Sequence, residues 1–259
     1  MSTKTYAVVT GASSGIGREF AILLAHKKHN VILIARNKNA LTDLQNVLKL
    51  QGVDIVVIPA DLSDEIQRKK CMDTLATYKI DILFNNAGFG DFGDFVEADW
   101  SKLNMLLQLN IVALTEFAYV VGGQMRQNTF GHIVNVASVA AFFPGPKMAT
   151  YYASKAYVLS LSQALAHELK PYGVSVTALC PGPTASGFQK AANLEKSNLF
   201  KDITMPTSAS VAAFAYKKMM RGTVVAIPGA SNKIQVQLPR IFPKNVIVSV
   251  VANIQKESA

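Results

Sequence analysis

A tyrosine and a lysine that could exchange protons lie four residues apart in this sequence. Tyr151 and Lys155 stand at the start of a long stretch of helical character, so their spacing places both side chains on one helical face. Free tyrosine has a pKa of about 10, which is too high for efficient proton exchange near neutral pH. A nearby ammonium group stabilises the phenolate, and lowering the pKa by about two requires about 3 kcal/mol. We therefore predict that Tyr151 donates and accepts a proton and that Lys155 lowers its pKa.

Other polar positions favour this interpretation over a chance pairing of two surface side chains. Ser138 ends a predicted strand, where catalytic groups gather in parallel sheets, and it could donate a hydrogen bond to a carbonyl oxygen. Asn110 interrupts an otherwise apolar helix. Tyr152 is the alternative to Tyr151, but it precedes Lys155 by only three residues and is less well placed.

A glycine-rich segment, TGASSGIG, follows the first predicted strand and opens the first predicted helix. In that context Gly11 permits a tight turn, Gly15 lets the backbone approach a pyrophosphate, and Gly17 allows close packing of the helix. Backbone N–H groups at the helix N-terminus would bind the phosphates. Ser13 and Ser14 add hydroxyl donors, and Ser14 could also cap the helix. A plain strand-to-helix turn is the alternative, because such a motif alone is weak evidence.

The end of the second predicted strand favours NADP(H) over NAD(H). Sites selective for NAD place a carboxylate there to bind the ribose 2′-hydroxyl. This sequence has Ala35 and Arg36 instead, so there is room for a 2′-phosphate and a guanidinium to pair with it. An Arg36 that faces solvent and discriminates little is the alternative.

Strand-like apolar runs alternate with amphipathic helical stretches along the chain. The predicted strands are residues 6–9, 31–34, 55–58, 82–84, 133–136, 174–179 and 224–227. The predicted helices are residues 15–28, 37–50, 63–78, 100–127 and 151–172. This alternation predicts an α/β fold with a parallel sheet of about seven strands and helices on both faces. We find no linker and therefore expect one domain over residues 1–259.

Composition excludes several classes of protein. Half of the residues are hydrophobic and 17% are charged, which suits a sheet buried on both faces. The net charge of +9 is scattered rather than clustered, so we expect no nucleic-acid binding. The four histidines and two cysteines share no metal-ligand spacing, so no metal is expected. We see no signal peptide. The late apolar run 246–252 is far shorter than the roughly 20 residues that span a bilayer. We therefore expect a cytoplasmic location.

Taken together, these motifs resemble the short-chain dehydrogenase/reductase family. The resemblance covers positions 5 to about 185. It is carried by residues 10–17, Asp61-Leu62, residues 85–88, Asn110, Ser138, the Tyr151/Lys155 pair and residues 181–184. It implies a doubly wound Rossmann-type sheet and a catalytic tetrad of Asn110, Ser138, Tyr151 and Lys155. It also implies homodimers or tetramers built on the two long helices.

The same resemblance implies a set of cofactor-binding residues. Lys155 would bind the nicotinamide ribose, Asp61 would lie near the adenine, Asn86 near the adenosine ribose, and Thr184 near the nicotinamide amide or a phosphate. Asn110 would hold a water that links the lysine to solvent. The complete expected set is Gly11, Ser13, Ser14, Gly15, Ile16, Gly17, Arg36, Asp61, Leu62, Asn86, Ala87, Gly88, Tyr151, Lys155, Pro181, Gly182 and Thr184.

The last 60 residues depart from the commonest pattern of the family, in which many members end in a Gly-Gly strand that supports tetramers. The chain looks like bacterial broad-specificity or uncharacterised short-chain oxidoreductases, some of them similar to acyl-lipid and steroid reductases. We expect an apolar substrate wall from Phe89, Phe92, Phe95, Phe142, Phe143 and Met148, and a substrate lid at residues 188–206. Cys180 is expected to be an ordinary buried strand residue. The divergent tail, residues 230–259, could cover the site, form an inter-subunit arm or lie on a membrane surface.

The sequence therefore predicts an NADP(H)-dependent oxidoreductase that interconverts a carbonyl and a secondary alcohol. Reduction of an apolar ketone or aldehyde is the favoured direction. One alternative is a non-catalytic, NADP-sensing regulator, although such proteins usually lose the tyrosine or the lysine, and both are present here. The other is a peripheral-membrane reductase of lipid-derived ketones, which vesicle flotation would distinguish from a soluble enzyme.

Overall fold

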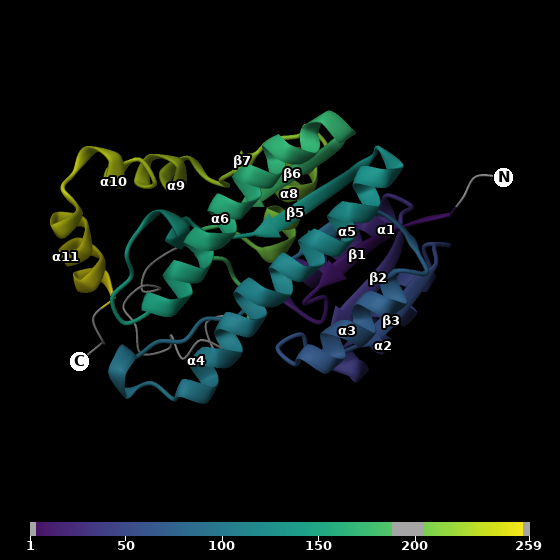
Figure 1. Ribbon diagram of the computed structural model, residues 1–259, viewed down its shortest axis with the longest axis horizontal. Coiled ribbons are helices and arrows are strands. Elements are labelled where there is room, and N and C mark those ends of the chain that lie inside the picture. Colours follow the sequence, from purple (N-terminus) through teal and green to yellow (C-terminus); the bar gives the residue numbers. More distant parts are fainter. Residues whose placement is uncertain (1–3, 188–204, 256–259) are drawn as a thin grey trace.

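A single parallel sheet organises the chain. The computed structural model describes residues 4–187 and 205–255. Its strands are β1 (Thr5–Thr10), β2 (Asn30–Ala35), β3 (Ile55–Pro59), β4 (Lys79–Asn85), β5 (Gly131–Val136), β6 (Val174–Leu179) and β7 (Val225–Ala226). They pair in the order β3-β2-β1-β4-β5-β6-β7 (Figure 1), and every pairing is parallel. The predicted α/β sheet of seven strands is confirmed.

Helices cover both faces of the sheet because the strands are apolar on both sides. Along β2, Val31 and Leu33 pack into one core cluster, whereas Ile32 and Ile34 pack into the cluster on the opposite face. The first face carries α1 (Gly15–His26), α2 (Lys38–Lys49) and α8 (Ser208–Met219). The second face carries α3 (Glu65–Leu75), α5 (Leu114–Asn128) and α6 (Ala149–Leu169).

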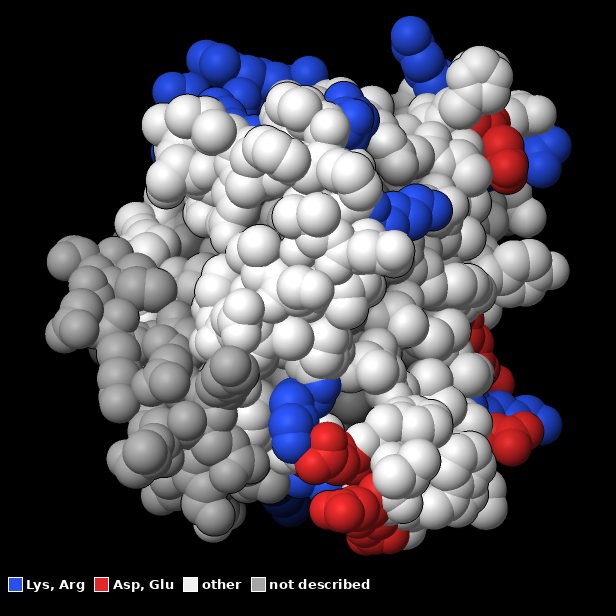
Figure 2. All heavy atoms as spheres, turned by 90° about the vertical axis from the view of Figure 1, so that its left-hand side faces the viewer, with Lys and Arg blue, Asp and Glu red and all other residues white. Residues whose placement is uncertain are grey.

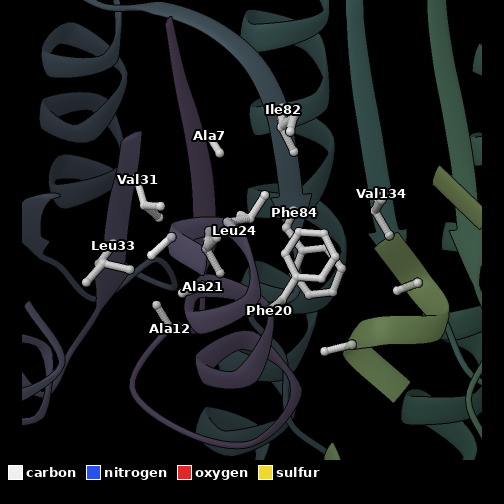
Figure 3. Packing of buried hydrophobic residues seen from close by; sticks show 14 of the residues in the cluster. Ala7, Ala12, Phe20, Ala21, Leu24, Val31, Leu33, Ile82, Phe84 and Val134 are labelled. Atoms are coloured by element: carbon white, nitrogen blue, oxygen red, sulfur yellow. The ribbon is translucent and has the colours of Figure 1, made fainter. Parts of the chain in front are cut away.

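Phe20 joins the first helix to the centre of the sheet. Its ring stacks on that of Phe84 in β4, with centroids 3.7 Å apart and planes 9° apart (Figure 3). Both side chains are fully buried, and Tyr216 of α8 lies 6.3 Å from the Phe20 ring. Because Phe20 follows the glycine-rich segment within α1, this packing holds the start of that helix against the sheet.

The long helix predicted at residues 100–127 is present, but it is not uniformly α-helical. It consists of α4 (Trp100–Leu107), a π-helical segment, η2 (Gln108–Ala113), and α5. Within the described parts of the chain, Trp100–Asn128 is the one helix long and apolar enough to cross a membrane by length and composition. Phe117, Val121 and Met125 are nevertheless fully buried against the sheet, as in the core helix of a globular protein.

Several predicted ends differ from the observed ones. The helix predicted at 63–78 begins only at Glu65, because the Asp64 carboxylate accepts a hydrogen bond from Gln67 N and caps it there. The helix predicted at 151–172 is α6 followed by a 3-10 turn, η4 (Lys170–Tyr172). Strand β7 pairs over only two of the four residues predicted at 224–227.

The tail forms three short helices beside the sheet, at the left of Figure 1: α9 (Ala230–Gln235), α10 (Leu238–Ile241) and α11 (Lys244–Ile254). The lid predicted at 188–206 lies outside the described residues except for Met205 and Pro206. Pro206 O accepts a hydrogen bond from Ala185 N at 3.0 Å.

Candidate active site

A cavity of about 790 Å³ opens at the carboxyl ends of the strands. Its walls are the glycine-rich segment, the ends of β2 to β6 with the loops that follow them, and helix α11. Of the residues expected at the catalytic and cofactor sites, all line this cavity except Gly17 and Asn110. Both exceptions lie behind the wall and support residues that do line it.

The glycine-rich segment is held against the end of β4. Gly11 and Gly15 adopt positive φ angles of 67° and 55°, which L-residues with side chains rarely adopt. The Thr10 hydroxyl accepts hydrogen bonds from Asn86 N at 2.9 Å and Ala87 N at 3.0 Å, and Asn86 Nδ2 donates to Thr10 O. No sequence pattern indicated this role of Thr10, whose side chain joins the glycine-rich segment to the loop after β4.

Ser14 does not cap α1 as expected. It occupies the N-cap position, but its side chain makes no capping hydrogen bond. The first-turn N–H groups of α1 are therefore not satisfied by this side chain and can serve an anionic ligand in the cavity.

Replacing Gly17 with Ala is expected to displace the glycine-rich segment, because the added Cβ would press on it from the side away from the cavity. A Cβ at this position would lie 2.5 Å from Gly11 O and 2.6 Å from Asn86 Nδ2, so the glycine-rich segment must shift. We expect a loss of about 1–3 kcal/mol in the free energy of unfolding, measured in urea, and weaker nucleotide binding. Gly123→Ala is the matched control, because Gly123 is also helical and a Cβ there meets nothing within 4 Å. Equal behaviour of the two variants would contradict the argument.

Tyr151, Ser138 and Lys155 meet at the floor of the cavity. Tyr151 and Lys155 lie on the first turns of α6, and Ser138 follows β5. The Ser138 hydroxyl is hydrogen-bonded to the Tyr151 side chain. Lys155 Nζ donates to Val136 O at 2.9 Å and lies 5.7 Å from the centroid of the Tyr151 ring.

Burial, rather than the lysine, dominates the acid–base properties of this cluster. Desolvation raises the pKa of Tyr151 above its ordinary value, and the hydrogen bond with Ser138 offsets only part of that rise. Desolvation also lowers the pKa of Lys155 to about 8. The net lowering of the Tyr151 pKa that the sequence predicted is therefore not found in the protein alone, because desolvation of the tyrosine outweighs any lowering by Lys155, whose ammonium is bound to the Val136 carbonyl.

The buried lysine predicts a specific pH dependence of stability. Its pKa falls from an ordinary 10.5 to about 8 on folding, so between these values the unfolded chain binds more protons and stability rises with pH. We expect the free energy of unfolding of the wild type, relative to that of Lys155→Met, to rise by up to about 1.4 kcal/mol per pH unit between about pH 8 and pH 10.5, and to stay constant below pH 8. Urea unfolding of both proteins across this pH range measures the difference between their free energies of unfolding. Groups that titrate in the same way in both proteins do not contribute to this difference. A difference that does not change with pH would contradict the lowered pKa.

Asn110 lies in the π-helical segment, fully buried behind the catalytic cluster. Its Nδ2 donates to Phe89 O at 2.9 Å and Ser154 Oγ at 3.1 Å, and its Oδ1 accepts from Phe89 N at 3.1 Å. A Cβ at Gly88 would lie 2.9 Å from Asn110 Oδ1. Asn110 thus fixes the loop after β4 against α6, and π-helical segments are frequent at functional sites.

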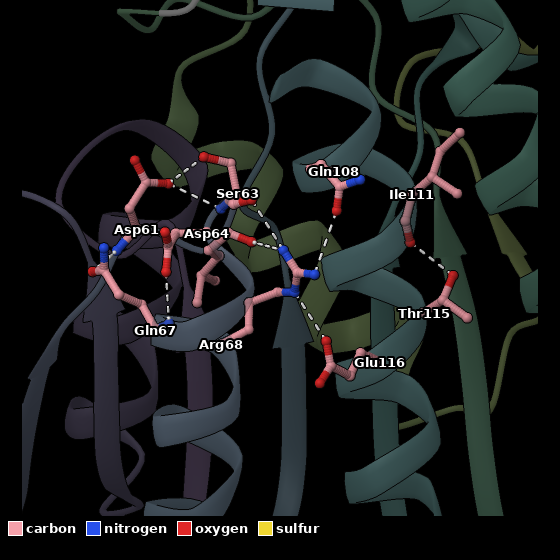
Figure 4. A network of polar contacts seen from close by, with 10 residues as sticks. Asp61, Ser63, Asp64, Gln67, Arg68, Gln108, Ile111, Thr115 and Glu116 are labelled. Atoms are coloured by element: carbon pink, nitrogen blue, oxygen red, sulfur yellow. Dashed lines mark hydrogen bonds and ion pairs between the residues drawn. The ribbon is translucent and has the colours of Figure 1, made fainter. Parts of the chain in front are cut away.

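A buried arginine holds the loop after β3, which lines the cavity (Figure 4). Arg68 of α3 forms an ion pair with Glu116 Oε2 of α5 at 2.9 Å. It also donates to Leu62 O and Ser63 O, both at 3.1 Å, and so fixes the loop after β3. The sequence predicted a helix here but no role for Arg68, because a buried arginine has no local signature.

Arg36 and Asp61 lie together where the cavity meets the ends of β2 and β3. Arg36 Nη1 lies 3.9 Å from Asp61 Oδ2, and the guanidinium is largely exposed. Asp61 Oδ1 accepts from the Ser63 N–H at 2.9 Å and the Ser63 hydroxyl at 2.6 Å. At the opposite end, the Thr184 hydroxyl donates to Gly182 O at 2.9 Å.

The expected apolar wall is only partly correct. Phe89, Phe143 and Met148 line the cavity. Phe92 packs behind them, and Phe142 lines a smaller neighbouring pocket. Phe95 is exposed, because it lies on a surface 3-10 turn, η1 (Phe95–Glu97).

Cys180 takes no part in the cavity. It is fully buried in a core cluster beside β6, and burial raises the pKa of its thiol to about 12. Within the two described ranges, no group of histidine, cysteine, aspartate and glutamate side chains could hold a metal ion.

Helix α11 forms one wall of the cavity, and Gln255 at its C-terminal end binds only one of the two neighbouring tyrosines. Gln255 Nε2 donates to the Tyr152 hydroxyl at 2.7 Å, whereas the Tyr151 side chain bonds Ser138. The Tyr152 ring packs so closely on Gly145 that a Cβ there would overlap it. The Tyr152 hydroxyl is therefore bound by the tail, whereas the Tyr151 side chain is bound by Ser138.

The sequence matches a family described as short chain dehydrogenase over residues 5–197. A very-long-chain 3-oxoacyl-CoA reductase from Podospora anserina is 33% identical over 178 residues, which are 66% of this chain and 52% of that protein. An uncharacterized oxidoreductase from Thermotoga maritima is 30% identical over 181 residues, which are 69% of this chain and 71% of that protein. The chain spans about half the length of the fungal reductases that it matches.

Two solved structures share the fold over nearly the whole chain. One is a short-chain dehydrogenase from Sphingobium yanoikuyae in complex with NADPH, with a TM-score of 0.83, 31% identity, and coverage of 99% of this chain and 98% of that one. The other is a bulky-bulky ketone specific alcohol dehydrogenase from Comamonas testosteroni, with a TM-score of 0.79, 31% identity, and coverage of 100% and 98%.

Proposed function

Because the chain belongs to the short-chain dehydrogenase family of oxidoreductases, we propose that it reduces an apolar ketone or aldehyde to an alcohol with NADPH. The observation that carries this proposal is the meeting of Tyr151, Ser138 and Lys155 in the cavity that the glycine-rich segment lines. A nicotinamide cofactor fits this cavity. The lining of the cavity continues from Arg36 past the first turn of α1, which can bind phosphates, to Tyr151.

The bound nicotinamide would supply the hydride, and the chain would supply orientation and the proton. The Tyr151 hydroxyl keeps its proton near neutral pH, because burial raises its pKa, and it can donate that proton to the carbonyl oxygen as charge develops there. Ser138 can donate a second hydrogen bond to the same oxygen. Lys155, with a pKa of about 8, is largely protonated at neutral pH and would stabilise the tyrosinate that remains.

Asn110 is a positioning residue in this proposal. It does not line the cavity but fixes Phe89 of the substrate wall and Ser154 of α6. Arg68 acts similarly at the adenine end through Leu62 O and Ser63 O.

Arg36 supports selectivity for NADPH, and Arg36→Glu is expected to reverse it. A guanidinium can pair with the 2′-phosphate, which a carboxylate would repel. We expect the Kd for NADPH to rise by about 100-fold and that for NADH to change little. Titration of both nucleotides by tyrosine and tryptophan fluorescence measures this. Lys69→Glu, an exposed site on α3 with the same charge change, is the control. Equal weakening of both nucleotides would contradict a role in discrimination.

An apolar substrate is favoured by the cavity wall, which Phe89, Phe143, Met148 and Val251 line. Two relatives are consistent with this class: one is named for very-long-chain 3-oxoacyl-CoA reduction and the other for bulky-bulky ketones. We also propose a cytoplasmic homodimer through the long helices, where Trp100, Tyr119 and Tyr157 are exposed.

Binding of NADPH followed by a screen of aromatic and long-chain ketones tests the function. We expect NADPH oxidation that depends on the ketone. If NADPH binds but no ketone is reduced, a nucleotide-sensing role replaces the enzyme. If neither nucleotide binds, the oxidoreductase assignment to this cavity is wrong.

A further inference from the structure

The α9–α11 surface (residues 230–254) exposes many large apolar side chains. Ile241 and Ile234 are 73% and 69% exposed. The other exposed members are Phe242, Val246, Val248, Val250 and Ile254. Clustered apolar exposure of this kind marks an interaction site more often than scattered surface residues do.

The charge of this segment has one sign. From residue 204 to residue 255 the sequence contains six lysines and arginines and no aspartate or glutamate. Lys233, Arg240 and Lys244 lie on the α9–α11 surface, are exposed, and form no ion pair within the described residues. Figure 2 shows a broad uncharged area on this side of the molecule, with Lys and Arg along its upper border and a mixed group of acidic and basic side chains below it. The surface thus complements an anionic partner.

The same segment forms the rim of the cavity. The residues of α11 and its C-cap that line the cavity recur at helical spacing: Ile247, Val250, Val251, Ile254 and Gln255. Ile247 and Gln255 are buried, whereas Val250 and Ile254 are both exposed and part of the lining. An apolar surface therefore runs from the outside of the tail into the substrate end of the cavity.

We propose that the α9–α11 surface docks on an anionic lipid surface, and that an apolar carbonyl substrate passes from the lipid into the cavity beside Val250 and Ile254. The docking stands on the exposed apolar side chains and the unpaired cations, whereas the substrate path rests also on the proposed function. A second copy of this face is a poor partner, because a symmetric pair would place the cations of both copies in one interface, and residues 204–255 hold no acidic side chain to offset them. Apolar insertion and attraction to anionic headgroups would act together here.

Flotation of the full chain with lipid vesicles tests the docking without any need for activity. We expect the protein to float with vesicles of phosphatidylcholine and phosphatidylglycerol, to float poorly with phosphatidylcholine alone, and to be released as salt rises from about 0.1 M to about 1 M. Reversing three charges (Lys233→Glu, Arg240→Glu and Lys244→Glu together) should lower the partition coefficient by about 100-fold. Ile241→Ser with Phe242→Ser should lower it as well.

Matched controls lie on helices at the far end of the sheet. Lys49→Glu, Lys69→Glu and Lys70→Glu together repeat the charge change on α2 and α3, and Leu50→Ser removes an exposed apolar side chain. The controls should float like the wild type, and all variants should keep the wild-type circular dichroism and NADPH binding. Equal loss in the controls, or no flotation of the wild type, would overturn the docking.

Light scattering completes the test. If the tail variants change the molar mass in solution while flotation stays constant, this face joins copies of the chain and the lipid proposal is wrong. Failure of the proposed function is distinguishable, because a protein that floats but neither binds NADPH nor reduces ketones would leave the docking intact.

Discussion

Tyr151→Phe is expected to lower kcat for ketone reduction by about 10²–10⁴-fold, the range typical of a lost general acid. The substitution removes only a hydroxyl at the floor of the cavity, where the Tyr151 side chain is hydrogen-bonded to Ser138. Because the ring remains, NADPH binding and the free energy of unfolding should change little. Steady-state kinetics with a reducible ketone, together with nucleotide titration, measure both.

Tyr152→Phe is the matched control for that substitution. It removes the neighbouring hydroxyl, whose partner is Gln255 Nε2 at 2.7 Å rather than the catalytic cluster. We expect the control to keep kcat within about tenfold of the wild type, because only the contact with the tail is lost. A larger loss of kcat in Tyr152→Phe than in Tyr151→Phe would mean that Tyr152, and not Tyr151, transfers the proton.

Phe20→Ala is expected to lower the free energy of unfolding by about 3–5 kcal/mol, which is the usual cost of emptying a fully buried aromatic site. The cavity would open between α1 and β4, where Phe20 stacks on Phe84 (Figure 3). Urea unfolding followed by circular dichroism measures the loss. Because Phe20 also holds the start of α1, nucleotide binding should weaken at temperatures where the fold persists.

Two further variants show whether the loss of stability in Phe20→Ala comes from the lost ring packing or would follow the removal of any phenylalanine. Phe130→Ala alters a largely exposed phenylalanine and should change stability by less than about 1 kcal/mol. The double variant Phe20→Ala/Phe84→Ala should lose less than the sum of its single variants, because each substitution removes the same ring contact. Additive losses would mean that the stacked pair is not a coupled unit.

Much of the fold follows from local sequence pattern. The continuous apolar run of β2 predicts a strand that is buried on both faces, and it is. The alternation of such runs with amphipathic helices predicts the parallel sheet, since parallel strands need crossover connections. Element ends were less accurate, because capping by residues such as Asp64 depends on local backbone geometry.

Errors in the predicted site have a common origin. Phe95 and Phe142 are of the right residue type for a substrate wall. The conformation of their loops, however, leaves Phe95 exposed and places Phe142 in the smaller neighbouring pocket. Ser14 has the right type and position for a cap, yet its side chain makes no capping bond. In each case a side chain's direction depends on loop packing that no local pattern encodes.

By itself, the sequence determined the order of strands and helices along the chain, the glycine-rich turn, and the placement of Tyr151 and Lys155 on one helical face. These features depend on residues within about one or two helical turns, so covalent spacing is enough to specify them. Only the tertiary structure decided that burial raises the pKa of Tyr151 and lowers that of Lys155. Only it joined Tyr152 to Gln255 and Arg68 to Glu116, because desolvation and long-range contacts arise when distant segments of the chain pack together.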